Sequence, residues 1–305
     1  MDWTRRGAAA AALGLALPGL ARAQETAPPA FGATRLQHDR LTVPVHINGK
    51  GPLAFAVDSA ANASVIAADL VERLELPDAG EVTMHTLIAR ETAATVRARL
   101  METGALTAHD TRLALVSRIG LDGADGLIGT DLLAGLRLDL RFLGVQRARI
   151  IGSRPTGGQF FEARRQSARL VRAVEQRFGE LLMIDIHAGG VEAVAIIDTG
   201  AQASIINMAL ARASGAAPLV LRDGSHEARV QSPTGRSAPA QAMMINNLRF
   251  GGLGLGRLPV LAGDFHTFDL WGVADRPAML MGVDVLGLFD NVAIDLRRGE
   301  VVFEL

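Results

Sequence analysis

Short apolar or alternating runs bounded by turn residues recur along the chain and predict β-strands. Runs at residues 41–47 and 53–57 flank Asn48-Gly49-Lys50-Gly51, and runs at 181–186 and 191–197 repeat this hairpin pattern. Further strands are predicted at residues 96–100, 113–116, 145–150 and 301–305. Short helices are expected at residues 67–74 and 208–213. The pattern therefore indicates a mainly β chain.

One ten-residue segment occurs twice. Residues 57–66 (VDSAANASVI) match residues 197–206 (IDTGAQASII) with an identical or similar residue at each position. Further matches follow in the same order, with a Gly-x-Asp sequence and then residues 138–141 (LDLR) against 294–297 (IDLR). We interpret this order as a tandem duplication.

The duplication predicts the domain organisation. We expect an N-terminal lobe at residues 36–152 and a C-terminal lobe at 166–305. A linker, residues 153–165, joins them, and its first part, residues 153–158, is rich in Gly, Pro and Ser.

The duplicated segment places an aspartate, Asp58 or Asp198, directly after a buried strand in each half. Burying a carboxylate is costly unless other groups satisfy it. At equivalent positions of two pseudo-symmetric lobes, the two aspartates are expected to meet at the interface. Two carboxylates so close together do not both ionise freely, and they share a proton. One can then activate water as a base while the other donates to a peptide carbonyl.

The sequence around Asp198 resembles a known family. Residues 198–205 (DTGAQASI) are similar to the D-T-G-A-x-x-[ST]-[VI] signature of retropepsin-like aspartic peptidases. Leu127-Ile128-Gly129 and Leu280-Met281-Gly282 resemble the second half of that family's ψ-shaped loop. The resemblance covers both lobes and implies an all-β, bilobal acid-protease fold. In that fold, two pseudo-symmetric β-barrel-like lobes enclose a central substrate cleft.

The resemblance also implies a function. The chain would be an aspartic endopeptidase acting on peptides or unfolded proteins, without a cofactor or a metal. Both halves of the site lie in one chain, as in pepsin, so a monomer would suffice.

Family roles carry over to matching positions. Asp58 and Asp198 would hold the water, and Gly129 and Gly282 would belong to the ψ-loops. The positions that would support the aspartates are Ser59, Ala60, Ala61, Thr199, Gly200 and Ala201. Among these, the two hydroxyls would bond the backbone of the opposite lobe, and the glycine would let the turns approach.

Ala60 departs from the family pattern, which has glycine there. An added methyl at a crowded turn could displace Asp58, and small misplacements cost much rate. The alternative is therefore a catalytically impaired peptide-binding or scaffold protein. A two-carboxylate glycosidase fits less well, because such enzymes hold their carboxylates in unlike environments, about 5 Å or more apart.

Hairpins that close over substrate are expected after each aspartate turn and helix. Ser232-Pro233-Thr234-Gly235-Arg236 has the turn chemistry of a hairpin tip in the second lobe. In the first lobe the equivalent tip is expected near residues 89–92, Ala-Arg-Glu-Thr, with weaker turn chemistry.

Other residues paired by the repeat have structural interpretations. Helix N-capping accounts for Asp131 and Asp284. Local ion pairs or turn contacts account for Asp139 and Asp295, and partly exposed strand positions account for His46 and His187. Residues 251–256 (GGLGLG) lack a following helix, so a loop between strands explains them better than a dinucleotide site.

Composition excludes several classes. The chain has 305 residues and a formal net charge of −1, without the basic excess of a nucleic-acid-binding protein. It has no cysteine, which excludes disulfides, thiolate nucleophiles and zinc–thiolate sites.

The N-terminus has the pattern of an export signal. Arg5 and Arg6 precede an apolar stretch, and Ala21-Arg22-Ala23 fits the cleavage site. The apolar stretch, interrupted by Pro18, is a poor membrane anchor. We therefore expect a signal peptide at residues 1–23, a flexible tail at 24–35, and a periplasmic or secreted protein.

Overall fold

The computed structural model describes residues 41–155, 168–177 and 181–305. All of these belong to one compact unit, Phe31–Leu305. The expected signal peptide, the expected tail and most of the expected linker lie outside the described residues. The domain boundaries given above therefore stay a prediction.

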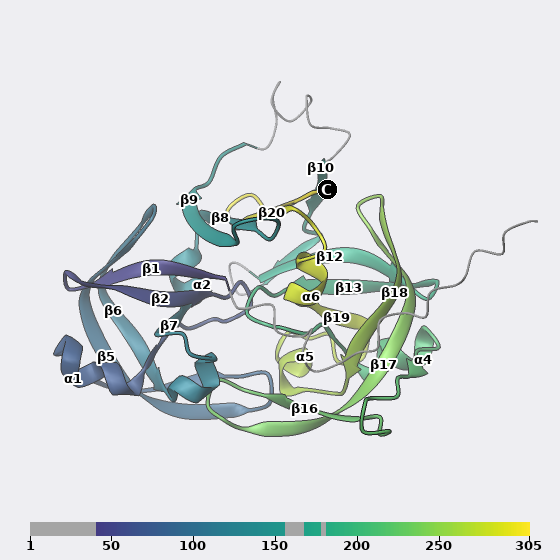
Figure 1. The fold of residues 1–305 in the computed structure, drawn as a ribbon, viewed down its shortest axis with the longest axis horizontal. Coiled ribbons are helices and arrows are strands. Elements are labelled where there is room, and N and C mark those ends of the chain that lie inside the picture. Colours follow the sequence, from purple (N-terminus) through teal and green to yellow (C-terminus); the bar gives the residue numbers. More distant parts are fainter. Residues whose placement is uncertain (1–40, 156–167, 178–180) are drawn as a thin grey trace, which may run out of the picture. The chain divides into compact units, whose positions relative to one another are not determined.

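Lobe one, the first half of the described chain, is built on a seven-stranded sheet of order β1-β2-β7-β3-β6-β5-β4 (Figure 1). The strands are β1 (Thr42–Ile47), β2 (Lys50–Val57), β3 (Val65–Ala67), β4 (Asp78–His85), β5 (Arg90–Thr103), β6 (Leu106–Val116) and β7 (Gly126–Ile128). The helices are the 3₁₀ helices η1 (Ala68–Leu70) and η2 (Arg118–Leu121), with α1 (Val71–Leu74) and α2 (Thr130–Leu133). Asn48 and Gly49 have positive φ angles of 52° and 77°, as the tight β1–β2 turn requires.

Lobe two, the second half, is built on a nine-stranded sheet of order β11-β12-β13-β19-β14-β18-β17-β15, with β16 paired to β17. The strands are β11 (Glu175–Arg177), β12 (Leu181–Ala188), β13 (Val191–Ile197), β14 (Ile205–Ile206), β15 (Ala217–Pro218), β16 (Glu227–Gln231), β17 (Ser237–Phe250), β18 (Leu253–Ala262) and β19 (Ala278–Met281). The helices are α4 (Met208–Ala213), α5 (His266–Leu270) and α6 (Val283–Leu286).

The two lobes share one pattern of strand pairing. In lobe one, β2 pairs in parallel with β7 and β3 with β6; in lobe two, β13 pairs in parallel with β19 and β14 with β18. The hairpins β1–β2 and β12–β13 also correspond. The mainly β, bilobal fold class is therefore confirmed.

A five-stranded sheet joins the lobes in the order β10-β21-β20-β8-β9. Its strands are β8 (Leu136–Arg141), β9 (Arg147–Gly152), β10 (Ala168–Arg172), β20 (Asn291–Asp295) and β21 (Glu300–Glu304). Leu138 of β8 lies opposite Ile294 of β20, and these residues are also equivalent in the sequence repeat. Equivalent residues can pair in this way only near a local two-fold axis, so the axis between the lobes passes close to this buried pair.

Asp139 and Asp295 lie in this sheet and have the structural roles expected of them. Asp139 accepts a hydrogen bond from Arg137 Nε at 2.8 Å. Asp295 accepts from Ser153 Oγ at 2.7 Å and from Arg298 N at 3.1 Å. Both interpretations, an ion pair and a turn contact, are confirmed.

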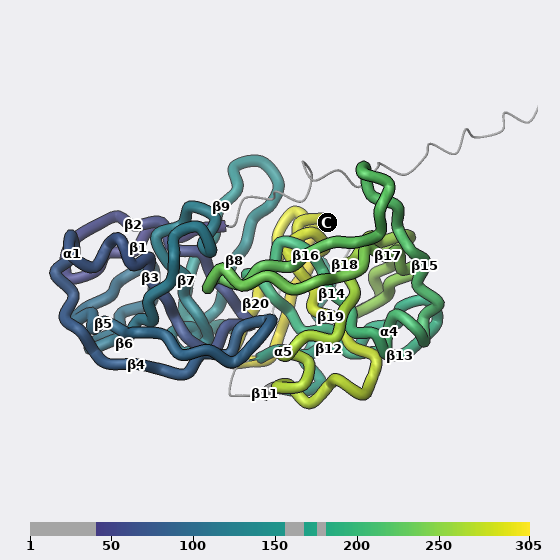
Figure 2. Tube along the Cα trace, turned by 90° about the horizontal axis from the view of Figure 1, so that it is seen from below, coloured from purple at the N-terminus to yellow at the C-terminus, as the bar shows by residue number. Residues whose placement is uncertain are grey.

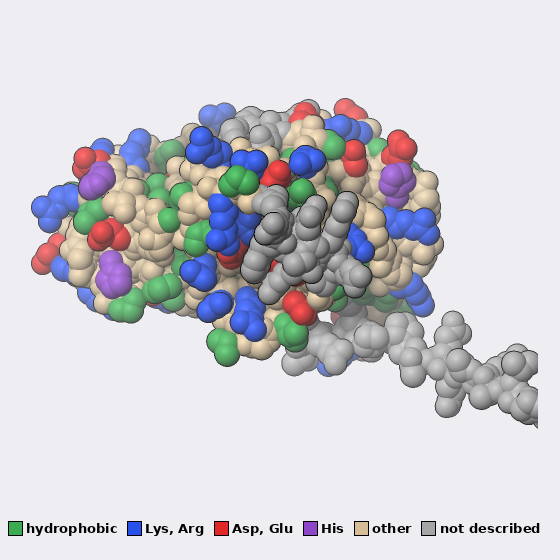
Figure 3. All heavy atoms as spheres, turned by 90° about the horizontal axis from the view of Figure 1, so that it is seen from above, with side chains coloured by type: hydrophobic (Ala, Val, Ile, Leu, Met, Phe, Trp, Pro, Cys, Tyr) green, Lys and Arg blue, Asp and Glu red, His purple; other side chains and the backbone are tan. Residues whose placement is uncertain are grey.

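The outer face of this sheet carries basic side chains. Arg141 of β8 and Arg147 and Arg149 of β9 are exposed. Figure 3 shows Lys and Arg side chains gathered over the middle of the molecule seen from this side, with acidic groups between them. The acidic groups keep the charge of this face mixed.

Phe303 offers a test of the core beneath the joining sheet. It is fully buried, and its ring lies 5.1 Å from that of Phe250 and 4.9 Å from that of Phe289. We expect Phe303→Ala to lower the free energy of unfolding by about 3–5 kcal/mol, because the cavity cannot close fully. Urea unfolding measures this loss. Leu143→Ala, at a position 60% exposed, is the control and should change it by about 0.5 kcal/mol or less; equal effects would contradict the assignment.

Candidate active site

Asp58 and Asp198 follow the two central strands of their lobes. Asp58 comes directly after β2, and its backbone N–H donates to Ile128 O of β7 at 2.9 Å. Asp198 comes directly after β13, and its N–H donates to Met281 O of β19 at 3.0 Å. Each aspartate is thus held at the end of a buried parallel strand pair.

The turn after each aspartate is stabilised by the aspartate itself. In each lobe Oδ1 of the aspartate accepts hydrogen bonds from the backbone N–H groups two and three residues later. The donors are Ala60 at 2.9 Å, Ala61 at 2.8 Å, Gly200 at 2.8 Å and Ala201 at 3.0 Å. The two carboxylates therefore have closely similar polar surroundings.

Two hydroxyl groups tie these turns to each other. Ser59 Oγ donates to Ile197 O at 2.7 Å, and Thr199 Oγ1 donates to Val57 O at 2.8 Å. Each hydroxyl also accepts from the backbone N–H of the other, at 3.1 Å and 3.2 Å. Both side chains are buried. The four bonds fix the ends of β2 and β13 relative to each other.

Gly200 lies at a close approach of the two lobes. A Cβ atom at this position would overlap the carboxylate of Asp58. Glycine therefore allows the lobe-two turn to approach the lobe-one aspartate.

Ala60, at the equivalent position of lobe one, instead packs its methyl group against a buried apolar cluster of lobe two that includes Leu280 and Trp271. The hydrogen bonds from Ala60 N and Ala61 N to Asp58 stay short. The added methyl thus leaves the contacts that hold Asp58 in place.

Both aspartates line one cleft of ≈ 540 Å³. Its walls include Leu127, Leu280 and Trp271, and the two hairpins β4–β5 and β16–β17 contribute to its lining. The cleft thus combines two carboxylates with apolar walls.

The two hairpins extend toward the opposite lobes (Figure 2). We call β4–β5 with its turn, residues 86–89, flap one, and β16–β17 with its turn, residues 232–236, flap two. Thr234 Oγ1 of flap two donates to Glu91 of flap one at 3.0 Å, and Arg236 pairs with Glu91 at 3.4 Å. The flaps therefore meet over the cleft.

The tip of flap one differs from the expected position. The turn spans residues 86–89, so of the expected residues only Ala89 lies in it, and Arg90, Glu91 and Thr92 already belong to β5. The Thr86 hydroxyl accepts from the N–H of Ala89 at 3.1 Å. A threonine side chain thus builds a turn that contains no glycine or proline, which explains the misplacement. In lobe two the turn falls on Ser232, Thr234, Gly235 and Arg236 as expected.

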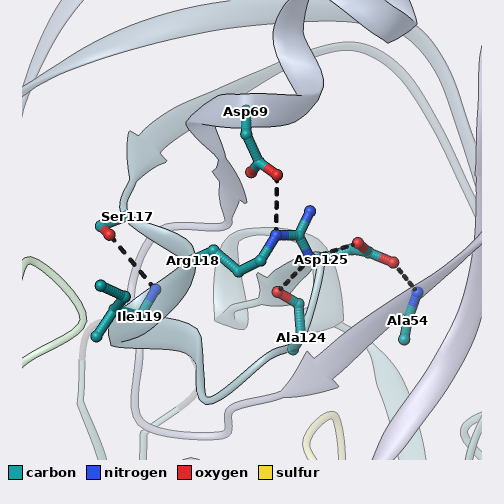
Figure 4. Close-up of polar contacts among 7 residues, drawn as sticks. All are labelled: Ala54, Asp69, Ser117, Arg118, Ile119, Ala124 and Asp125. Carbon is teal, nitrogen blue, oxygen red and sulfur yellow. Dashed lines mark hydrogen bonds and ion pairs between the residues drawn. The ribbon is translucent and has the colours of Figure 1, made fainter.

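Flap two also rests on lobe one at η2. A Cβ atom at Gly120 of η2 would overlap the backbone of Pro233. Figure 4 shows how η2 is anchored: Arg118 donates to Asp69 at 2.9 Å and to Asp125 at 2.8 Å. This anchor gives flap two a fixed seat.

The family model described as aspartyl protease matches residues 43–132 and 183–285, and each match contains one aspartate turn and one ψ-loop glycine. The chain belongs to the aspartyl protease family. A search of curated proteins gave no significant match.

In this aspartyl protease a second layer of contacts supports each turn. Ser64 Oγ accepts from Gly129 N at 2.9 Å and donates to Asp131 at 2.7 Å. In lobe two Ser204 accepts from Gly282 N at 3.0 Å and donates to Asp284 at 2.7 Å. The serines therefore connect each aspartate turn to its ψ-loop.

The predicted N-capping role of Asp131 and Asp284 is therefore wrong. The N-cap positions of α2 and α6 are Gly129 and Gly282, and the aspartates lie inside the first turn of each helix. From there their carboxylates reach back to the serines. The repeat contained this signal, because it pairs both the serines and the aspartates.

Burial raises the pKa of Asp131 and of Asp284, and the hydrogen bonds from Ser64 and Ser204 oppose that rise. The ψ-loop glycines are constrained by packing: a Cβ would lie 2.7 Å from Ala61 O at Gly129. Both features show that the ψ-loops are closely packed.

Other predicted positions lie away from the cleft. His46 and His187 are exposed on β1 and β12, as expected. Gly251 and Gly252 form the β17–β18 turn, and Gly254 and Gly256 lie in β18. In the described part of the chain, no helix is long and apolar enough to cross a membrane, and no three His, Asp or Glu side chains could together hold a metal ion.

Ser204→Ala tests the support beneath the lobe-two turn. Losing the hydroxyl leaves the buried Asp284 carboxylate less satisfied, so we expect a loss of about 1–3 kcal/mol in unfolding free energy at neutral pH. The pKa of Asp284 would rise further above its unfolded value. The loss of unfolding free energy should therefore be complete above the raised pKa of Asp284. It should shrink as the pH falls toward the pKa that Asp284 has in the unfolded chain.

Urea unfolding at neutral and acid pH measures this effect. Ser117→Ala, which removes the exposed hydroxyl that caps η2 and touches no carboxylate, is the control, and its effect should not depend on pH. A Ser204→Ala loss that is equally independent of pH would contradict the role assigned to Ser204.

Proposed function

We propose that this aspartyl protease is an endopeptidase that cleaves peptide bonds with water activated by Asp58 and Asp198. The observation that carries the proposal is the reciprocal bonding of Ser59 and Thr199. These bonds hold the two aspartate turns together at the floor of one cleft.

In the proposed reaction the two aspartates have opposite protonation states. Since Oδ1 of each accepts two backbone N–H groups, Oδ2 is the oxygen assigned to the chemistry. The ionised carboxylate takes a proton from water, whose oxygen attacks the peptide carbonyl carbon. The protonated carboxyl donates to the carbonyl oxygen, giving a tetrahedral diol. Transfer of a proton to the amide nitrogen then breaks the C–N bond and releases an amine and a carboxylic acid.

The proposed substrate is an extended peptide segment, free or in an unfolded protein. The flaps close over the cleft from both lobes, so a substrate must be thin enough to lie beneath them. Extended segments can bond strand edges through their backbone. Apolar side chains such as Leu127 and Leu280 would contact apolar side chains of the substrate.

The second candidate is an impaired peptide-binding protein. Its motivation is Ala60, but the hydrogen bonds that hold Asp58 match those that hold Asp198 in lobe two. This similarity favours an active enzyme. It also argues against a glycosidase, in which the two carboxylates need unlike surroundings.

Export to the periplasm or outside the cell is part of the proposal and rests on the sequence of residues 1–23. A monomeric enzyme is likewise proposed, since one chain supplies both aspartates. The matching strand pairing of the lobes supports an origin by duplication.

Replacing either aspartate tests the mechanism. We expect Asp58→Asn and Asp198→Asn each to lower cleavage of a mixed peptide library by about a hundredfold or more, because the asparagine cannot exchange the required proton. Mass spectrometry of the products, from acid to neutral pH, measures cleavage. Asp122→Asn, elsewhere in the cleft lining, is the matched control and should keep activity. Peptide cleavage that survives both substitutions would contradict the proposed mechanism.

Exchanging the residues at the two equivalent turn positions tests the role of Ala60. Gly200→Ala should lower kcat/KM by about a hundredfold, because its methyl group would displace Asp58. Ala60→Gly should change kcat/KM by less than about tenfold, since the Asp58 contacts are already in place. If the natural chain binds peptides without cleaving them and Ala60→Gly restores cleavage, the impaired protein is the correct description.

A further inference from the structure

A pair of histidines joins the two lobes at the edge of the cleft. His85 is the last residue of β4 in flap one, and His266 is the first residue of α5 in lobe two. Their Nδ1 and Nε2 atoms lie 2.9 Å apart, and the rings are stacked with centroids 5.2 Å apart. At this distance one nitrogen must donate a proton and the other must accept it.

The histidines belong to a larger seat for flap one. Thr267 N of α5 donates to Leu87 O of the flap turn at 3.4 Å. Leu87 and Ile88 pack against the apolar cluster of lobe two. His85, Leu87 and Thr267 all line the cleft. Substrate that enters beneath flap one must therefore break these contacts between flap one and lobe two.

The surroundings of the histidine pair disfavour protonation of His85. Burial, His266 and the nearby Arg90 lower the pKa of His85. In the described part of the chain, neither imidazole forms an ion pair with a carboxylate. Glu91 on β5 is engaged by Thr234 and Arg236 of flap two.

Other charged groups face the same space from the remaining elements. Those that line the cleft are Asp58, Asp122, Asp198 and Arg229. Asp269 of α5 is exposed. An added proton on the pair thus faces a neighbouring cation, Arg90, without a dedicated counter-ion.

We propose that His85 and His266 form a pH-sensitive latch that holds flap one on lobe two at neutral pH and releases it in acid. When both rings are neutral, one donates to the other. When both are protonated, neither nitrogen can accept, and two cations face each other beside Arg90.

The direction of the pH effect follows from the open and closed forms. With the flap open, the His85 ring is free to protonate near the ordinary histidine pKa of about 6.5. In the closed form burial, His266 and Arg90 disfavour protonation of His85, so the latch is fully stable above that pKa. It weakens as the pH falls below it. Each unit of difference in pKa between the forms changes the open-to-closed ratio by about tenfold.

Spin-label distances test the latch without any readout of hydrolysis. Because the chain has no cysteine, labels can be placed at Thr92→Cys on flap one and Asp275→Cys in lobe two, both exposed. We expect one short distance at pH about 7.5 and an added longer population at pH about 5. A second pair within lobe two, at Arg222→Cys and Asp275→Cys, should not change.

Variants of His266 identify the titrating group. His266→Phe keeps a stacked ring but cannot bond or titrate, so its distances should be the same at both pH values. His266→Gln can donate to neutral His85 or accept from protonated His85, so the flap should stay closed at both. The His266→Gln variant serves as the test if circular dichroism shows that His266→Phe does not fold. Absence of the acid population in the natural chain, or its persistence in these variants, overturns the latch whether or not the cleft is catalytic.

Discussion

The reciprocal hydrogen bonds between Ser59 and Thr199 are the contact on which the cleft depends. Each hydroxyl donates to a strand carbonyl of the other lobe and accepts from the other's backbone N–H, so both hydroxyls and both N–H groups at this crossing are bonded. The crossing is buried, where hydrogen bonds are stronger and an unpaired partner is costly. The crossing also positions the two aspartates, because each of them directly precedes one of the two hydroxyl residues in the sequence. Serine and Gly-x-Asp contacts then brace each turn from behind.

The two lobes are related by an approximate two-fold axis, which some of their contacts obey and others break. Equivalent residues pair at the joining sheet, through Leu138 and Ile294, and again at the hydroxyl crossing. The flaps break the symmetry, because flap one rests on α5 whereas flap two rests on η2. The turns break it too, since glycine in lobe two faces an aspartate and alanine in lobe one packs on apolar groups. The floor of the cleft is therefore nearly symmetric, while its roof is not.

The sequence predicted what depends on local pattern and on repetition. Apolar runs gave the hairpins around the aspartates, helix α4 was predicted with its observed ends, and the repeat singled out Asp58 and Asp198. Contacts between segments far apart in the sequence could not be predicted in this way. Asp131 was assigned to a helix end because its serine partner lies 67 residues away, and the tip of flap one was missed because a threonine hydroxyl builds the turn. His85 and His266, 181 residues apart, carry no shared motif at all.

The position of α5 has a consequence for how a bound chain must run. Lobe two places Leu270 of α5 and the following Trp271 against the cleft, while lobe one has η2, with Ile119 and Gly120, at the corresponding point between its strands. A peptide has distinct amino and carboxyl ends, whereas the pair of aspartates alone treats both directions almost alike. The bulky, largely apolar wall on one side removes that equivalence. We therefore expect polypeptides to lie in the cleft with a single orientation, so that residues before and after the scissile bond meet chemically different surfaces.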